Sequence, residues 1–171
     1  MAILGYASFS DPIGAPTSHA KRSYSMDIRD LRNAPPRSPN DLLGGYVILA
    51  RTIDKCRADL VGMAGDYHWN CRLATMFFDF KGIAPDMFRA RIAEGLTDDE
   101  IQAWTNTTGT LRTEDEILAW SYDCRWNAPA TTELKAFIER NAREISPNYL
   151  YIRSLFELID IEEGQFTLTA R

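Results

Sequence analysis

Two short segments of the sequence are near-copies of each other, and both have the pattern of a helix start. TDDEIQAW spans residues 97–104 and TEDEILAW spans residues 113–120. Each begins Thr-x-x-Glu, in which the Thr hydroxyl and the Glu carboxylate accept hydrogen bonds from each other's backbone NH groups. The acidic residues after each Thr also suit the positive end of the helix dipole. We therefore predict one helix from each copy, with Trp104 and Trp120 packed into the core.

Apolar residues at helical spacing predict a longer helix over residues 43–61. Its apolar stripe consists of Leu49, Ile53, Cys56 and Leu60. Arg51, Lys55 and Asp59 fall on the opposite side, where Lys55 and Asp59 would form a surface ion pair. Gly62 and Gly65 follow, and glycine readily takes the left-handed conformation that ends a helix.

Three further helices are predicted towards the C-terminus. Pro85 suits a first turn, which predicts a helix over residues 85–94. Apolar spacing predicts another helix over residues 131–144. Ser146 followed by Pro147 would start the last helix, which runs to about Ile159.

These elements predict an all-α fold, a single compact domain of about six or seven helices. The domain would span residues 26–171 and follow a flexible N-terminal arm over residues 1–25, which is rich in Ser, Gly, Ala and Pro. Residues 66–71 are the only segment in which an extended conformation is expected.

Charge and composition exclude several classes of protein. The net charge is −5 at pH 7 with no run of Lys or Arg, whereas a nucleic-acid partner requires a basic patch. No apolar run is long enough to span a membrane, and the N-terminus lacks the pattern of a secretory signal. Three cysteines are an odd number and few for 171 residues, which favours free thiols in the reducing cytoplasm over disulfides.

The segment DKCRADLVGMAGDYHWNCRLATMFFDF, residues 54–80, carries the residues best suited to a binding site. His68 is suited to acid–base chemistry, and Asp79 would orient its ring. Arg57 offers a planar donor group for an anion, and Asn70 offers hydrogen bonds. An apolar wall would consist of Tyr67, Trp69, Phe77, Phe78 and Phe80.

We therefore predict that the protein binds or acts on a small anionic molecule in a pocket between the 43–61 helix and the 66–80 segment. His68 and Asp79 would be catalytic, Arg57, Asn70 and Tyr67 would bind the ligand, and no cofactor or metal is expected. Whether the protein is an enzyme stays open. The competing interpretation is a packed turn in which Arg57 pairs with Asp79 and the aromatic residues belong to the core.

Two other chemistries fit the same segment. A metal-dependent enzyme would use His68 and Cys71, with Cys56 and Cys124 as further candidate ligands, because zinc accepts Cys and His ligands. No Cys-x-x-Cys pair supports this interpretation, and Cys56 lies on an apolar stripe. A nucleophilic Cys71 with His68 as its base is the second alternative, with Arg72 adjacent as a cation.

The alternative from a different class is a non-catalytic interaction module, which could be a homodimer. In this hypothesis the helices that carry Trp104 and Trp120 would present an exposed apolar patch to a protein partner.

Several segments resemble a family of small bacterial proteins, the domain of unknown function 5069. They are PPRSPNDLLGGYVILARTIDKCRA (Pro35–Ala58), GDYHWNC, FFDFKGI, DDEIQAW and WSYDCRWNAPAT. The resemblance covers about residues 26–143 and leaves the N-terminal 25 residues outside it. It implies a small, mostly helical, stand-alone domain. It implies no activity and no cofactor, and it transfers no catalytic residue.

Overall fold

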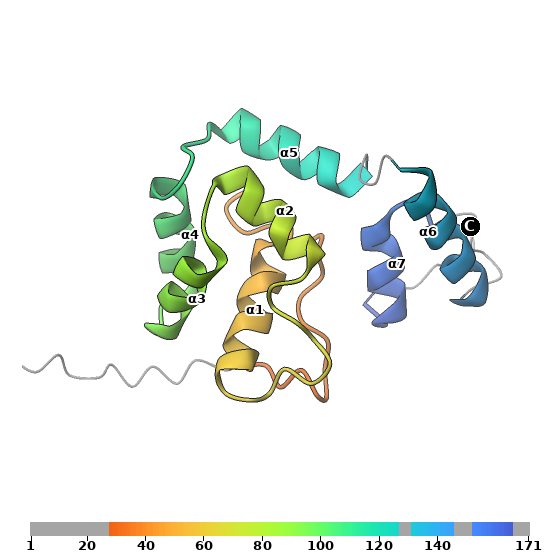
Figure 1. The fold of residues 1–171 in the computed structure, drawn as a ribbon, viewed down its shortest axis with the longest axis horizontal. Coiled ribbons are helices and arrows are strands. Elements are labelled where there is room, and N and C mark those ends of the chain that lie inside the picture. Colours follow the sequence, from red (N-terminus) through yellow and green to blue (C-terminus); the bar gives the residue numbers. More distant parts are fainter. Residues whose placement is uncertain (1–27, 127–130, 146–151, 166–171) are drawn as a thin grey trace, which may run out of the picture.

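The computed structural model describes residues 28–126, 131–145 and 152–165, which form seven α-helices (Figure 1). In chain order these are α1 (Leu49–Leu60), α2 (Arg72–Lys81), α3 (Pro85–Ala93), α4 (Asp98–Thr107), α5 (Glu114–Trp126), α6 (Thr132–Ile145) and α7 (Leu155–Glu162). No strand occurs among the described residues, so the predicted all-α fold class is confirmed. The arm predicted over residues 1–25 lies outside them. Within the described ranges, no helix combines the length and apolar character needed to cross a membrane.

Helix α1 lies at the centre of the larger group of helices, with α2 packed against one end and α3 against its side (Figure 1). The core beside it is aromatic. Tyr46 and Phe77 are fully buried and meet edge to face, with ring centroids 5.7 Å apart. Trp104 and Trp120 pack against this core and are partly buried, as the two near-copies predict. Trp120 stacks on Phe80 at 4.6 Å.

Helix α1 begins at Leu49, six residues later than predicted, because the chain turns tightly before it. Gly44 and Gly45 both have positive φ, at 58° and 84°. Leu43 and Tyr46 exchange backbone hydrogen bonds across this turn. Apolar periodicity does not distinguish such a turn from the first turns of a helix. The end of α1 is as predicted, because Gly62 follows the last turn with a φ of 73°.

Reciprocal capping bonds form at both near-copies, as predicted. The Thr97 hydroxyl accepts from the Glu100 NH at 3.2 Å, and the Glu100 carboxylate accepts from the Thr97 NH at 2.9 Å. Thr113 and Glu116 make the same pair of bonds at the start of α5.

The last helix is displaced from its predicted position. Helix α7 begins at Leu155, with Ser154 as its N-cap in a third reciprocal capping box with Glu157. Ile152 and Arg153 are not helical. Ser146 and Pro147, which were predicted to start this helix, lie outside the described residues. The Ser-x-x-Glu pattern at residues 154–157 is the stronger start signal.

Helix α2 was not predicted as a helix. The preceding segment, residues 66–71, forms turns and bends rather than the expected extended conformation. Leu73, Ala74, Phe77 and Phe78 are the buried apolar residues of α2. Leu73 and Phe77 are four residues apart, and so are Ala74 and Phe78. Two such neighbouring pairs are typical of a helix with a broad buried face. The helix ends at Gly82, whose φ is 61°.

Helices α6 and α7 pack together around a small second core and are joined to the α1 region by polar contacts (Figure 1). Its buried residues are Ile138, Ala142, Ile152 and Leu158. Asp160 on α7 accepts hydrogen bonds from Ser38 and Asn40, both at 2.8 Å. Glu163, which follows α7, pairs with Arg51 on α1. The C-terminal helices therefore supply polar groups to the region around α1.

Candidate functional site: a lysine and a cysteine at the start of α2

Cys71 occupies the N-cap of α2, with extended backbone angles (φ −94°, ψ 175°). Its side chain is partly exposed. The thiol makes no capping hydrogen bond, so the free NH groups of the first turn act on it through their dipoles. The start of a helix is a position that favours a negatively charged sulfur.

Lys55 on α1 points at this thiol. Its Nζ donates to the Cys71 Sγ at 2.9 Å, and the residue is only 4% exposed. The surface pair predicted between Lys55 and Asp59 is therefore wrong, because Asp59 instead binds Arg89 at 3.0 Å. We call Lys55 and Cys71 the lysine–cysteine pair. A buried lysine needs a hydrogen-bond partner, and for Lys55 that partner is a thiol that can acquire negative charge.

The lysine–cysteine pair favours the thiolate. Burial by itself would raise the pKa of the Cys71 thiol, but the charge and hydrogen bond of Lys55 and the NH groups of Ala74 and Leu73 outweigh it. The net result is a pKa of Cys71 below its ordinary value. Burial lowers the pKa of Lys55, and the Cys71 charge opposes that change. A depressed pKa, a cationic neighbour and partial exposure are the usual surroundings of a reactive cysteine.

An ion pair borders the lysine–cysteine pair. Arg51 lies one turn before Lys55 on α1, is 5% exposed, and donates to the Glu163 carboxylate at 2.8 Å. The Tyr67 ring lies 5.7 Å from the Arg51 guanidinium carbon. Burial and the Glu163 charge raise the pKa of the Tyr67 hydroxyl. Glu163 pairs with Arg51 and also acts on Lys55 through its charge, whereas Cys71 is the group that contacts Lys55 directly.

The other two cysteines have the opposite environment. Cys56 is fully buried and Cys124 is 4% exposed. Burial raises the pKa of each thiol to about 12. Both therefore behave as small apolar side chains, and Cys71 is the thiol suited to chemistry.

Arg57, predicted to bind an anion, is occupied by groups of the protein itself. Its guanidinium donates to Asp98 at 2.6 Å and to the carbonyl oxygen of Leu96 at 2.8 Å. The alternative Arg57–Asp79 pair does not form. Asp98 also binds Arg37, which in turn binds Asp54 at 2.7 Å. We call Arg37, Asp54, Arg57 and Asp98 the arginine–aspartate network.

The remaining predicted site residues are not brought together. His68, Asn70 and Asp79 are all exposed, and within the described structure no hydrogen bond joins His68 to Asp79. Tyr67 does lie beside the site, against Arg51. Phe77 and Phe78 belong to the core rather than to a pocket wall. The acid–base roles of His68 and Asp79 stay predictions without a contact that supports them.

The metal alternative also finds no assembled site. No group of three or more His, Cys, Asp and Glu side chains in the described ranges is arranged to hold a metal ion. Of the residues considered as ligands, Cys56 and Cys124 are buried, whereas His68 is exposed.

The sequence pairs Cys71 with His68, three positions away, and places Lys55 on the side of its helix opposite the apolar stripe. In the structure, Lys55 is the residue that contacts the thiol. If α2 had been predicted from the spacing of its apolar residues, Cys71 would have been placed at the start of a helix. That position is the signal that could have drawn attention to a lysine on the facing helix.

The fold and the site together define a small all-α protein with a lysine-paired cysteine between its first two helices. The profile of one family, described as domain of unknown function (DUF5069), matches residues 33–165. The match covers more than half of the chain, so the protein belongs to the DUF5069 family, as its sequence resemblance implies. A comparison with curated proteins finds no match.

Proposed function

We propose that this protein acts on a small electrophilic molecule that carries a negative charge, with Cys71 as the nucleophile. The observation that carries the proposal is the 2.9 Å contact between the buried Lys55 Nζ and the Cys71 Sγ. The site lies between α1 and the 66–80 segment, where the sequence predicts a ligand. The reacting residues proposed here are Cys71 and Lys55 instead of His68 and Asp79.

The chemical step follows from the state of the sulfur. The thiolate electron pair forms a bond to an electrophilic carbon, and the electron pair of the broken bond departs with the leaving group, which takes a proton from water. As the sulfur loses its charge, the Lys55 ammonium becomes available to a neighbouring anionic group. Arg72, exposed in the first turn of α2, is adjacent to Cys71 in the chain and adds a second positive charge.

Alkylation rates test this proposal. Iodoacetamide should modify Cys71 in the native protein much faster than Cys56 or Cys124, which serve as internal controls. Iodoacetate is anionic, whereas iodoacetamide is neutral. The ratio of the iodoacetate rate to the iodoacetamide rate at Cys71 should therefore be higher in the native protein than in the urea-unfolded chain. Equal alkylation rates at all three native cysteines would rule out Cys71 as the nucleophile. A lower iodoacetate-to-iodoacetamide ratio in the native protein than in the unfolded chain would rule out an anionic substrate.

The setting proposed for this chemistry is the cytoplasm. All three cysteines lie in the described residues and all are free thiols. A thiolate nucleophile functions only where it stays reduced, as it does in that compartment. Fractionation of cells that express the full-length protein would test this location.

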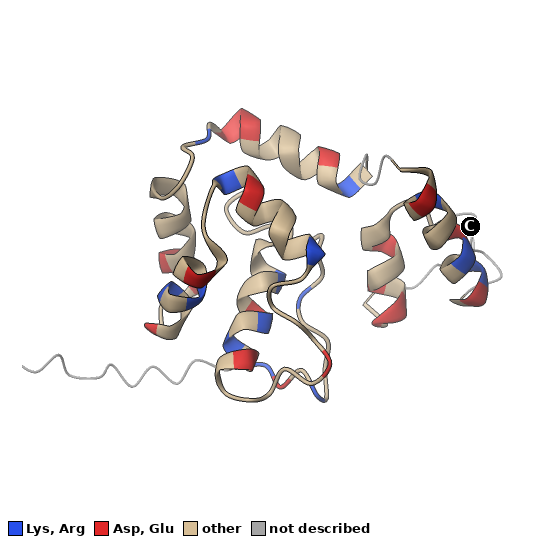
Figure 2. Ribbon diagram, viewed as in Figure 1, with Lys and Arg blue, Asp and Glu red and all other residues tan. Residues whose placement is uncertain are grey.

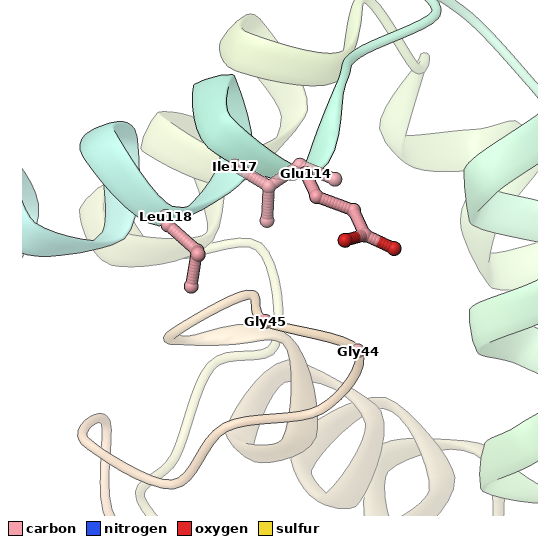
Figure 3. Close-up of a pocket in the computed structure, with 5 residues that line it drawn as sticks. All are labelled: Gly44, Gly45, Glu114, Ile117 and Leu118. Carbon is pink, nitrogen blue, oxygen red and sulfur yellow. The ribbon is translucent and has the colours of Figure 1, made fainter.

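We infer a second candidate function, self-association through α5, from an exposed apolar stripe. Leu118, Tyr122 and Trp126 lie four residues apart on one face, and each is about half exposed. The middle of α5 carries no charged residue (Figure 2). A shallow pocket of about 180 Å³ beside the stripe is lined by Gly44, Gly45, Glu114, Ile117 and Leu118 (Figure 3). This stripe replaces Trp104 and Trp120 as the predicted contact surface, because both pack on the core.

A second copy of the chain is the occupant that fits this stripe. The first turn of α5 is acidic and its last turn carries Arg125, which donates to Asn40. An antiparallel pair of α5 helices would place the acidic first turn of each copy beside Asp123 and Arg125 of the other, whose charges cancel, and let an apolar side chain of each copy enter the other's pocket. Analytical ultracentrifugation should show a dimer that Tyr122→Glu dissociates and Met87→Glu, an exposed control on α3, does not. A wild-type monomer over the whole concentration range would exclude this function.

A further inference from the structure

Cys71 has no second thiol that could trap an oxidised form of it. The sequence contains three cysteines, and the other two are 0% and 4% exposed. Because burial raises the pKa of Cys56 and Cys124 to about 12, neither provides a thiolate near neutral pH. A sulfenic acid formed on Cys71 therefore cannot proceed to an intramolecular disulfide in the native fold, which is a common fate of such a group.

The group that does contact Cys71 is an amine. Lys55 Nζ lies 2.9 Å from Sγ, close enough for a bond to form with a small movement of one side chain. Burial lowers the pKa of Lys55, and the negative charge of the thiolate opposes that change. Oxidation of the thiolate to a neutral sulfenic acid removes the opposing charge, so Lys55 gives up its proton more readily. A neutral amine has the lone pair that attack on sulfur requires.

We propose that a hydroperoxide converts the lysine–cysteine pair into a covalent sulfur–nitrogen crosslink between Cys71 and Lys55. This inference rests on the proposed function, because it requires Cys71 to be a reactive thiolate. It assigns a modification site to the α1–α2 junction. The crosslink would shield the sulfur from further oxidation and would remove the nucleophile reversibly.

The chemistry has two steps. Sγ first attacks one peroxide oxygen: an S–O bond forms, the O–O bond breaks, and sulfur loses two electrons to the peroxide, whose other oxygen leaves as hydroxide or alkoxide. The Lys55 nitrogen then attacks sulfur: an S–N bond forms, the S–O bond breaks, and the hydroxyl group leaves as water with a proton from the amine. A thiol such as dithiothreitol reverses the result by reducing the S–N bond to thiol and amine.

The test exposes the reduced full-length protein to hydrogen peroxide and then to dimedone, which captures sulfenic acids. Tandem mass spectrometry should find the peptides of Lys55 and Cys71 joined, with two hydrogen atoms fewer than the reduced pair, and dithiothreitol should separate them. In Lys55→Arg, which keeps the positive charge but lacks a nucleophilic amine, dimedone capture at Cys71 should rise several-fold. Cys71→Ser should give neither product.

Two failures can be told apart. If Cys71 is alkylated quickly but peroxide gives only sulfenic or sulfinic acid in the wild type, the crosslink is disproved and the nucleophile stands. If Cys71 is neither alkylated faster than Cys56 nor oxidised, the proposed function fails and the crosslink fails with it. The wild-type measurement decides both cases, so the conclusion does not depend on whether Lys55→Arg folds.

Discussion

The arginine–aspartate network and the lysine–cysteine pair both include a cation of α1. They differ in the acidic group that binds the cation, which is a carboxyl group in the first and a thiol in the second. In the arginine–aspartate network, Arg57 is 13% exposed and Asp98 binds it and Arg37 together. In the lysine–cysteine pair, Lys55 is 4% exposed and its partner is a thiol. The two clusters lie on the same helix and differ both in the cation and in the acid, of which the acid is the group whose charge can change near neutral pH.

The acid decides what each cluster does. A carboxyl group has an ordinary pKa near 4, so it is ionised at neutral pH with or without a cation, and the network's ion pairs contribute to stability. A thiol has an ordinary pKa near 8.5, so its charge at neutral pH depends on the cation beside it. The network therefore holds the structure, whereas the lysine–cysteine pair controls a reactivity.

The largest expected difference is between Cys71 and the two core cysteines. A thiol whose pKa is about 12 is ionised at pH 7 about a thousandfold less than an ordinary thiol, and burial slows its reaction further. Native protein treated with iodoacetamide should therefore be modified at Cys71 about a thousandfold faster than at Cys56 or Cys124. Peptide mass spectrometry measures the three rates, and in urea they should converge. A native ratio near one would contradict the structure.

Asp98→Asn should have the largest effect on stability. Both arginines would lose a charged acceptor in a partly buried position, which costs about 3 kcal/mol. Urea unfolding followed by circular dichroism measures the loss. The matched control is Asp59→Asn, whose pair with Arg89 has side chains 36% and 40% exposed and should contribute less than about 0.5 kcal/mol. Similar losses of unfolding free energy in the two variants would show that the network stabilises the protein no more than a surface ion pair does.

Acid should remove the difference between wild type and Asp98→Asn. Burial would raise the pKa of Asp98, but the hydrogen bonds and charges of Arg37 and Arg57 outweigh it and lower the pKa. A lowered folded-state pKa means that the stabilisation is complete above the unfolded-state pKa of about 3.9 and disappears as the pH falls through the folded-state value. The gap in unfolding free energy should be constant from pH 7 to about pH 5 and shrink below about pH 4. A gap unchanged at low pH would assign the support to packing.

How much of this could be predicted from the sequence depends on how local each signal is. The capping boxes at Thr97 and Thr113 involve residues three positions apart, and both form as predicted. The predicted start of α1 is too early, because Gly44 and Gly45 belong to a tight turn whose apolar neighbours have helical spacing. The contact between Lys55 and Cys71 depends on how α2 meets α1, and single-sequence spacing does not contain that angle.

The apolar stripe was the misleading signal on α1. It predicts that Arg51 and Lys55 lie on the opposite, solvated side, yet both are at most 5% exposed. Their partners, Glu163 and Cys71, lie 112 and 16 residues along the chain. Burial of a charge can be predicted only when its partner is known.

Lys55→Met should have a smaller effect on stability than Asp98→Asn and a clear effect on reactivity. Replacement of a buried ion pair by an apolar side chain is often neutral, and here the thiol left behind can simply take up a proton. Loss of the Lys55 charge and hydrogen bond raises the pKa of Cys71, so its alkylation rate at pH 7 should fall several-fold. Rates measured from pH 5 to 10 should show the rise in alkylation moved to higher pH in the variant. An unmoved profile would assign the thiolate to the α2 N-terminus alone.

The position of Glu163 near the end of the chain sets an order of assembly on the ribosome. Lys55 and Cys71 are separated by 16 residues and emerge almost together, whereas the carboxylate for Arg51 is synthesised 112 residues after it. Until then the junction of α1 and α2 has an excess cation, which favours the thiolate. We therefore expect the nascent protein to be most sensitive to electrophiles before Glu163 has been synthesised. Alkylation of ribosome-stalled chains that stop before or after α7 would test this, and slower modification of the shorter chains would refute it.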